Sequence, residues 1–244
     1  MELCFAETFA GESLFGRFLD SFNKTSRLGR AVVAREVLLR RAVREAIERD
    51  GEGPARVLAV AAGPAIELRR LLDETGPLRR PVQLILLDQD REAHESAHRH
   101  LTRILLERHH GMLPVAVQCL QFSVRQLLKP QNSQDNEVIG QTIADLDLAY
   151  SSGLYDYLPG PVAASLTRLL FSRLRPGGRL LVGNVVETPE ITWLMDYVLG
   201  WPLLYRSEET LLRLADGLVP TPSRSGVTPD ATGRCLFLDV TSPS

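Results

Sequence analysis

The length, composition and charge of the chain describe an ordinary folded protein. Its 244 residues suit one large α/β domain with or without a small appendage, and 44% of them are hydrophobic while 24% are charged. A formal net charge of -2 at pH 7, from 28 Lys and Arg against 30 Asp and Glu, argues against a nucleic acid as substrate.

The cysteines and the N-terminus indicate a cytoplasmic protein. Three widely separated cysteines without a CxxC pair favour neither a disulfide framework nor a zinc site. The N-terminus is acidic where a signal peptide would be basic, and no apolar run of about 18 residues occurs. We therefore expect no signal peptide and no membrane span.

The first fifty residues are predicted to be helical. Val32, Leu39, Val43 and Ile47 lie on one stripe at helical spacing, before a Gly- and Pro-containing break at residues 50–54. Because these helices have no place in a sheet, we expect residues 1–52 to form a lid over a ligand cleft. Its hinge would be Asn23, Lys24 and Thr25.

Strands and helices then alternate along residues 53–244, which we take as the second domain. Apolar runs predict strands over 56–62, 82–87, 114–120, 146–151 and 179–185. Helices are expected from Pro64, after residue 90, over 124–128 and over 161–174, whereas the polar segment 129–140 is expected to be an exposed loop and 175–178 a turn. This alternation predicts a doubly wound parallel sheet.

The end of the chain departs from this alternation. After a helix near residues 207–217, two extended stretches at 221–228 and 235–241 are separated by a turn with hairpin chemistry. The expected fold is therefore a Rossmann-like, seven-stranded sheet, mostly parallel, with a C-terminal antiparallel hairpin.

Two turns after predicted strands carry the strongest site signals. The turn from Ala61 to Ala65 consists of small residues, which let a ligand approach the backbone, although small residues also simply permit close helix packing. Asp88 ends the next strand, where a carboxylate can accept both hydroxyls of a ribose; a solvated helix N-cap is the alternative explanation.

These features, in this order and spacing, resemble the class I S-adenosylmethionine-dependent methyltransferases. The resemblance covers about residues 56–240 and rests on VLAVAAGPAIEL, LLDQD, YSSGLYDYL, LRPGGRLLVGNV and the terminal hairpin. The segments at residues 184–186, 193–197 and 204–206 add a narrower resemblance to bacterial methyltransferases related to 3-hydroxypalmitate methyl ester synthases, which esterify a carboxylate. The GxGxxG of nicotinamide dehydrogenases, a third reading, is absent.

The resemblance implies S-adenosylmethionine as cofactor and assigns its contacts. Asp88 would take the ribose hydroxyls, Gln89 would lie over the adenine, and Phe122 and Ser123 would border the adenine, with core packing as the alternative for Phe122. The remaining cofactor residues that it implies are Ala61 and Gly63 in the first turn, and Ser151, Ser152 and Gly153 at the methionine end.

The first motif departs from the family pattern at three positions. Ala59, Ala61 and Ala65 replace the usual acid and two glycines, so a catalytically silent, methyltransferase-like binding or partner protein is a second hypothesis. Glu67 is a candidate substitute for the missing acid, although an acidic residue in the first helical turn also suits the helix dipole.

Aromatic residues and arginines indicate the acceptor side. The aromatic residues concentrated after residue 149 are suited to wall a pocket; Tyr155 is the best candidate for the site, whereas Trp193 and Tyr197 at i and i+4 favour packing of an inserted helix. Arg35 and Arg206 are candidates to bind an acid substrate, with surface ion pairs as the alternative.

The histidines are not placed to act as a base at this site. All five lie between the second and third strands, and the His94–His98 pair lacks the carboxylates that a metal site would need. The sequence thus predicts a metal-independent methyltransferase for an oxygen nucleophile of a small molecule, with a carboxylate as one candidate. It leaves the oligomeric state open, a homodimer included.

Overall fold

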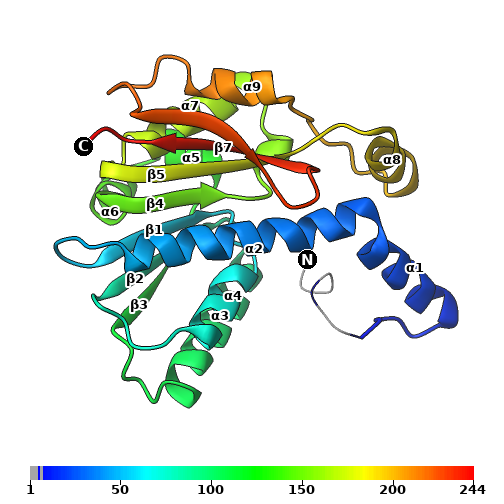
Figure 1. Ribbon diagram of the computed structural model, residues 1–244, viewed down its shortest axis with the longest axis horizontal. Coiled ribbons are helices and arrows are strands. Elements are labelled where there is room, and N and C mark those ends of the chain that lie inside the picture. Colours follow the sequence, from blue (N-terminus) through cyan, green and yellow to red (C-terminus); the bar gives the residue numbers. More distant parts are fainter. Residues whose placement is uncertain (1–4, 6–7) are drawn as a thin grey trace.

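The computed structural model describes residue 5 and residues 8–244. Its centre is a sheet in the order β3-β2-β1-β4-β5-β7-β6, in which β1 to β5 are parallel and β7 is antiparallel to both β5 and β6 (Figure 1). The strands are β1 (Ala55–Val60), β2 (Val82–Asp88), β3 (Val115–Gln121), β4 (Leu146–Ser151), β5 (Leu174–Val185), β6 (Arg224–Pro229) and β7 (Cys235–Thr241). The predicted fold, with its antiparallel C-terminal hairpin, is confirmed.

Helices cover both faces of the sheet. On one face lie α2 (Arg27–Glu48), α3 (Ile66–Glu74) and α4 (Arg91–Glu107); on the other lie α5 (Val124–Leu128), α6 (Ser133–Thr142), α7 (Gly160–Phe171) and α9 (Glu208–Leu212). Outside these layers are α1 (Leu14–Thr25), α8 (Pro189–Thr192) and the π-helical segment η3 (Trp193–Val198). Short 3₁₀ turns occur at η2 (Tyr155–Tyr157) and η4 (Arg213–Ala215).

The N-terminal helices divide between core and periphery. The C-terminal half of α2 is a core element, because Leu39, Val43 and Ile47 are buried against the sheet and α3. In contrast, α1 extends beyond the N-terminal end of α2 (Figure 1). Ser26 alone separates the two helices, as the C-cap of α1 and the N-cap of α2. The expected hinge residues therefore form the last turn of α1, and the division at residue 52 stays a prediction.

Three local expectations are corrected. The segment expected as a loop contains α6, which begins at an Asn132 side chain that accepts from the Asp135 amide and which buries Ile139 in the core. Pro64 does not begin α3, because Ala65 at its N-cap is left-handed with φ 49°. The turn at residues 175–178 lies within β5 as a register shift, where Gly178 leaves no room for a Cβ beside the Leu146 carbonyl.

The topology fixes where a ligand can bind. Strand order reverses between β1 and β4, since β2 and β3 lie on one side of this pair and β5 on the other. In open α/β sheets, the crevice at the carboxyl ends of the strands at such a point is the ligand site. The turns that follow β1 and β4 are therefore the first place to look.

Candidate functional site

The turn after β1 has an unusual backbone. Ala61, Gly63 and Ala65 all have positive φ angles, of 53°, 52° and 49°. Gly63 faces open space, since a Cβ built on it would meet no atom within 4 Å. The turn therefore presents bare backbone at the carboxyl end of β1, as a site for a closely approaching ligand requires.

Asp88 ties this turn to the end of β2. Its Oδ2 accepts a hydrogen bond from the Gly63 amide at 2.8 Å, and its Oδ1 accepts from the Asp90 amide at 3.0 Å. Each carboxylate oxygen can accept a further hydrogen bond. The Asp88 carboxylate is thus held in place and half-buried at the sheet edge, and it retains capacity for ligand hydroxyls.

A cavity of about 50 Å³ lies at the switch point between the turns after β1 and β4. Its lining brings together six of the predicted site residues, from α2, from the first turn of α3 and from both turns: Arg35, Ala61, Gly63, Glu67, Ser152 and Gly153. This volume holds one or two water molecules, whereas small-molecule ligand pockets measure about 300–1,000 Å³. A nucleoside ligand would therefore require side chains of α2 to move outward.

Arg35 is the one arginine among the described residues that line this cavity. It is buried, and a guanidinium nitrogen lies 3.3 Å from the position that a Cβ on Gly153 would take. Its positive charge opposes the rise that burial causes in the pKa of Asp156 and of Glu67. Arg35 is therefore a cation held among acids beside the turn after β4.

Glu67 and Tyr150 form a polar pair next to the same cavity. The Tyr150 hydroxyl donates to Glu67 Oε1 at 2.6 Å. Burial raises the pKa of Glu67 and outweighs the opposing effect of this hydrogen bond. Glu67 is a site residue predicted from the sequence, whereas its hydrogen bond to Tyr150 depends on how α3 packs beside β4, which no local pattern reveals.

The turn after β4 contains a buried polar atom without a partner. The Ser151 side chain is fully buried, and its Oγ has no hydrogen-bond partner among the described residues. Ser152 and Gly153, which follow it, line the cavity. An orphaned buried hydroxyl is unfavourable, so a ligand or water that pairs with it fits this position.

The residues expected at an adenine lie farther along the same edge. Gln89 is exposed after β2, and the Phe122 amide donates to the Asp88 carbonyl at 3.2 Å, so the two turns adjoin. Phe122 also packs against the core, and the Ser123 hydroxyl is engaged with Gln126 in a capping box at the start of α5. Core packing and helix capping therefore account for these two side chains as well.

Tyr155 and Arg206 lie in the protein interior, away from the cavity. Tyr155 is fully buried, and its hydroxyl lies 3.1 Å from Thr167 Oγ1. The Arg206 guanidinium donates to the carbonyls of Tyr155 and Leu158 and to Asn184 Oδ1. Neither side chain lines the cavity, and the role of these two residues toward an acceptor stays a prediction.

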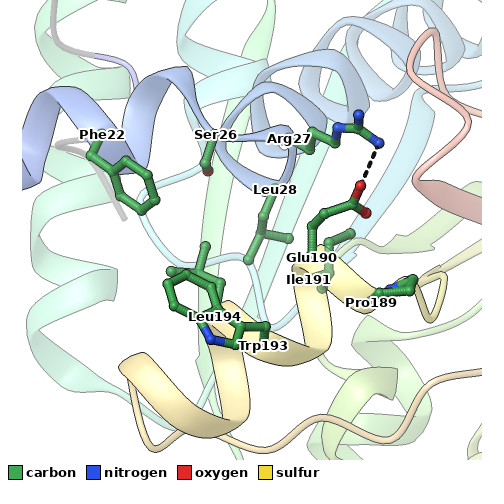
Figure 2. Close-up of a pocket in the computed structure, with 9 residues that line it drawn as sticks. All are labelled: Phe22, Ser26, Arg27, Leu28, Pro189, Glu190, Ile191, Trp193 and Leu194. Atoms are coloured by element: carbon green, nitrogen blue, oxygen red, sulfur yellow. Dashed lines mark ion pairs between the residues drawn. The ribbon is translucent and has the colours of Figure 1, made fainter.

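A second and larger cavity of about 500 Å³ lies between the junction of α1 and α2 and the segment that follows β5 (Figure 2). Its lining is mainly apolar and comprises Phe22, Ser26, Arg27, Leu28, Pro189, Glu190, Ile191, Trp193 and Leu194. An exposed ion pair of 3.0 Å, between Arg27 and Glu190, joins the two walls. Sequence reasoning missed this cavity, and the only signal was the aromatic stripe of residues 15–22.

The expectation that Trp193 and Tyr197 serve helix packing is wrong. Both side chains are exposed, at 55% and 81%. The side chains that this segment buries are Leu194 and Met195, so Trp193 and Tyr197 lie on its outer side.

Two features are absent from the described part of the chain, residue 5 and residues 8–244. No group of three or more His, Cys, Asp or Glu side chains there is arranged to hold a metal ion. No helix there combines the length and the apolar character needed to cross a membrane.

Solved structures share this architecture at low sequence identity. A possible exported protein from Bordetella parapertussis matches with a TM-score of 0.73 and 17% identity, over 100% of this chain and 78% of that one. A magnesium protoporphyrin IX methyltransferase from Synechocystis PCC 6803 with bound S-adenosylhomocysteine matches with a TM-score of 0.59 and 11% identity, over 96% and 89% of the two chains. The fold is that of the S-adenosylmethionine-dependent methyltransferases.

The likeness extends to other proteins of this fold. A putative O-methyltransferase from Nostoc punctiforme matches with a TM-score of 0.59 and 11% identity, over 97% of this chain and 63% of that chain. No family model and no curated protein sequence matches the chain. At these identities the likeness establishes the fold, and the activity must be argued from the site.

Proposed function

We propose that this protein is an S-adenosylmethionine-dependent methyltransferase that acts on a small-molecule oxygen nucleophile, a carboxylate in particular. The observation that carries the proposal is that the bare turn after β1 and the turn after β4 line one cavity at the switch point of the sheet, while the Asp88 carboxylate accepts a hydrogen bond from the Gly63 amide of the first turn. The methyltransferase fold of its structural neighbours supports the same cofactor.

The residues present fit a nucleoside cofactor in type and in position. Asp88 would hold the ribose hydroxyls, the Gly63 backbone would face the ligand, and the orphaned Ser151 hydroxyl would gain a partner. Glu67 would contact the cationic methionine end of the cofactor. It would replace the acidic residue that the family usually has at the position of Ala59. S-adenosylmethionine, when bound, supplies a methyl group that is electrophilic because it is attached to a sulfonium.

Arg35 would orient the acceptor. Its guanidinium lies beside Gly153 at the end of the site expected to hold the methionine part, and a guanidinium fork binds both oxygens of a carboxylate. A carboxylate is already deprotonated at pH 7 and needs no general base. The chain's contribution is therefore to align two reactants and to exclude water. Such positioning can lower the activation free energy by about 7–11 kcal/mol.

The proposal is tested by the chemical class of the product. We expect the purified protein to transfer a labelled methyl group from S-adenosylmethionine to members of a panel of carboxylic acids, and the label to be released as methanol by mild base. Base-labile label identifies an ester. Base-stable label on amines or hydroxyl compounds, with none on any acid, would refute the carboxylate assignment.

A matched pair of variants tests the role of Arg35 in that assay. Arg35→Met removes a charge-assisted hydrogen-bond donor worth about 1.5–3 kcal/mol, so we expect ester formation at limiting acid to fall at least tenfold. Arg30→Met removes an exposed arginine from the same helix and should leave the rate unchanged. Equal rates for Arg35→Met and the wild type would rule Arg35 out as the acid-binding residue.

One observation favours the second hypothesis, a binding or partner protein without catalysis. The cavity of about 50 Å³ is much smaller than a nucleoside ligand requires, and alanines occupy two left-handed positions of its turn. Transfer of label to no acceptor of any class, together with no binding of S-adenosylhomocysteine, would make this hypothesis the better one.

A further inference from the structure

Two apolar faces flank the cavity of about 500 Å³. The α1 face consists of Leu14, Phe15, Phe18 and Phe22. The ring centroids of Phe15 and Phe18 are 6.4 Å apart, and those of Phe18 and Phe22 are 6.5 Å apart. The η3 face consists of Trp193, Tyr197 and Val198. All these side chains are exposed, and α1 buries none of its described residues.

The faces belong to opposite walls of the one cavity. Phe22 from the α1 face and Trp193 from the η3 face both line it, and Figure 2 shows their rings on opposite sides of the space. The Arg27–Glu190 ion pair at 3.0 Å is a polar link between the walls and is exposed to solvent. An exposed ion pair contributes about 0–1 kcal/mol, so this polar link adds little to the apolar packing of Leu28 against the cluster of Val185, Ile191 and Met195.

The polar groups of the lining already have partners within the chain. Arg27 and Glu190 neutralise each other, and the Ser26 hydroxyl donates to the Asn23 carbonyl at 2.7 Å and accepts from the Gly29 amide at 3.0 Å. The rest of the lining is aliphatic or aromatic. A volume of about 500 Å³ lies within the range of small-molecule pockets. The cavity is therefore suited to an uncharged, apolar group.

The large cavity and the small one lie along one side of α2. Leu28 lines the large cavity and Arg35 the small one. Seven residues make nearly two helical turns, so the two side chains share a face of α2 about 10 Å apart. A single acceptor of that length would reach from the first cavity to the second.

We infer that the large cavity binds the apolar body of the acceptor, a ring system or short hydrocarbon chain, while its reacting oxygen lies toward Arg35. This inference rests on the proposed function and adds the substrate class. Apolar surface of Phe22 and Trp193 would leave water when such a group binds between them. Phe22, Leu28 and Trp193 then determine acceptor specificity.

The test uses an uncharged apolar probe and the only two tryptophans of the sequence. Trp193 and Trp201 are equally exposed, at 55% and 56%, but only Trp193 lines the large cavity. In fluorescence titrations with N-phenyl-1-naphthylamine, we expect Trp193→Ala to weaken binding at least fivefold and Trp201→Ala to change it less than twofold. Equal effects of the two substitutions, or none, would overturn the inference.

A second variant and a second readout separate this inference from the proposed function. Leu28→Phe fills part of the cavity with apolar volume, so we expect weaker probe binding. Because Leu28 also packs against the cluster of Val185, Ile191 and Met195, a thermal unfolding curve checks that the variant is folded. The titration needs no cofactor, so probe binding without binding of S-adenosylhomocysteine would refute only the methyltransferase. If transfer to acids occurs, Trp193→Ala should raise KM for apolar acids with little change in kcat; an unchanged KM would place the acceptor elsewhere.

Discussion

Ala61 adopts a left-handed backbone that a residue with a Cβ rarely takes, and this costs about 1–2 kcal/mol relative to an ordinary conformation. Glycine has no such cost. Its greater conformational freedom in the unfolded chain, however, lowers the free energy of unfolding by about 0.4–1 kcal/mol, which offsets part of the gain. We therefore expect Ala61→Gly to raise the free energy of unfolding by about 0.5–1 kcal/mol in urea denaturation. Ala62→Gly, in the same half-buried turn but without a positive φ, should lower the free energy of unfolding. A lower free energy of unfolding in both variants would contradict the left-handed conformation of Ala61.

Glu67 is a second residue whose environment sets a measurable property. Burial raises the pKa of Glu67, so folding favours its protonated carboxyl. The carboxylate therefore lowers the free energy of unfolding, and this effect grows as pH rises above the ordinary pKa of 4.5. Glu67→Gln keeps an acceptor for the Tyr150 hydroxyl without the charge. Urea unfolding should show the variant more stable than the wild type at pH 7.5, with the difference shrinking toward pH 4.5.

The control for Glu67 is an exposed glutamate. Glu95 on α4 forms an ion pair with Arg91 at the surface. Glu95→Gln should give no gain in stability at pH 7.5. A stability difference for Glu67→Gln that is absent or that grows toward low pH would show that the carboxylate is stabilised by folding.

At the scale of elements, Arg206 joins the segment before α9 to η2 and β5. Its guanidinium satisfies the carbonyls of Tyr155 and Leu158 and the side chain of Asn184, all buried. Loss of the donor leaves these acceptors unpaired, so we expect Arg206→Met to cost about 2–4 kcal/mol of unfolding free energy in urea denaturation. Arg213→Met, which removes only the exposed pair with Glu209, should cost less than about 1 kcal/mol.

Elements also show where sequence reasoning succeeds and where it fails. The buried strands β1, β2 and β4 are continuous apolar runs, which period and length identify without tertiary information. Helix α6 was missed because it buries few residues, Ile139 among them, and its start depends on a side-chain cap by Asn132. A polar sequence whose apolar contacts to the core come only from Val138 and Ile139 among the residues of α6 is consistent with a loop or a surface helix.

At the scale of the whole molecule, the order of the strands brings the predicted turns together. The side chain of α2 that narrows the site is placed instead by packing between segments far apart in the sequence. Ala61, Gly63 and Ser152 line one cavity because β1 and β4 are neighbours, which alternation of strands and helices predicts. The position of the Arg35 guanidinium beside Gly153 depends on how α2 docks on the sheet. Tyr155 and Arg206 are buried and do not line this cavity, because sequence shows proximity to a strand end and not the direction of a side chain.

The most direct measurement is a calorimetric titration of the purified protein with S-adenosylhomocysteine. We predict binding of one molecule per chain in the micromolar range, abolished by Asp88→Ala and retained by Asp90→Asn, which preserves the N-cap of α4. Absence of binding to the wild type, with or without an apolar carboxylic acid present, would contradict the assignment of the switch-point cavity as a cofactor site. Equal binding by wild type and Asp88→Ala would contradict the role of Asp88.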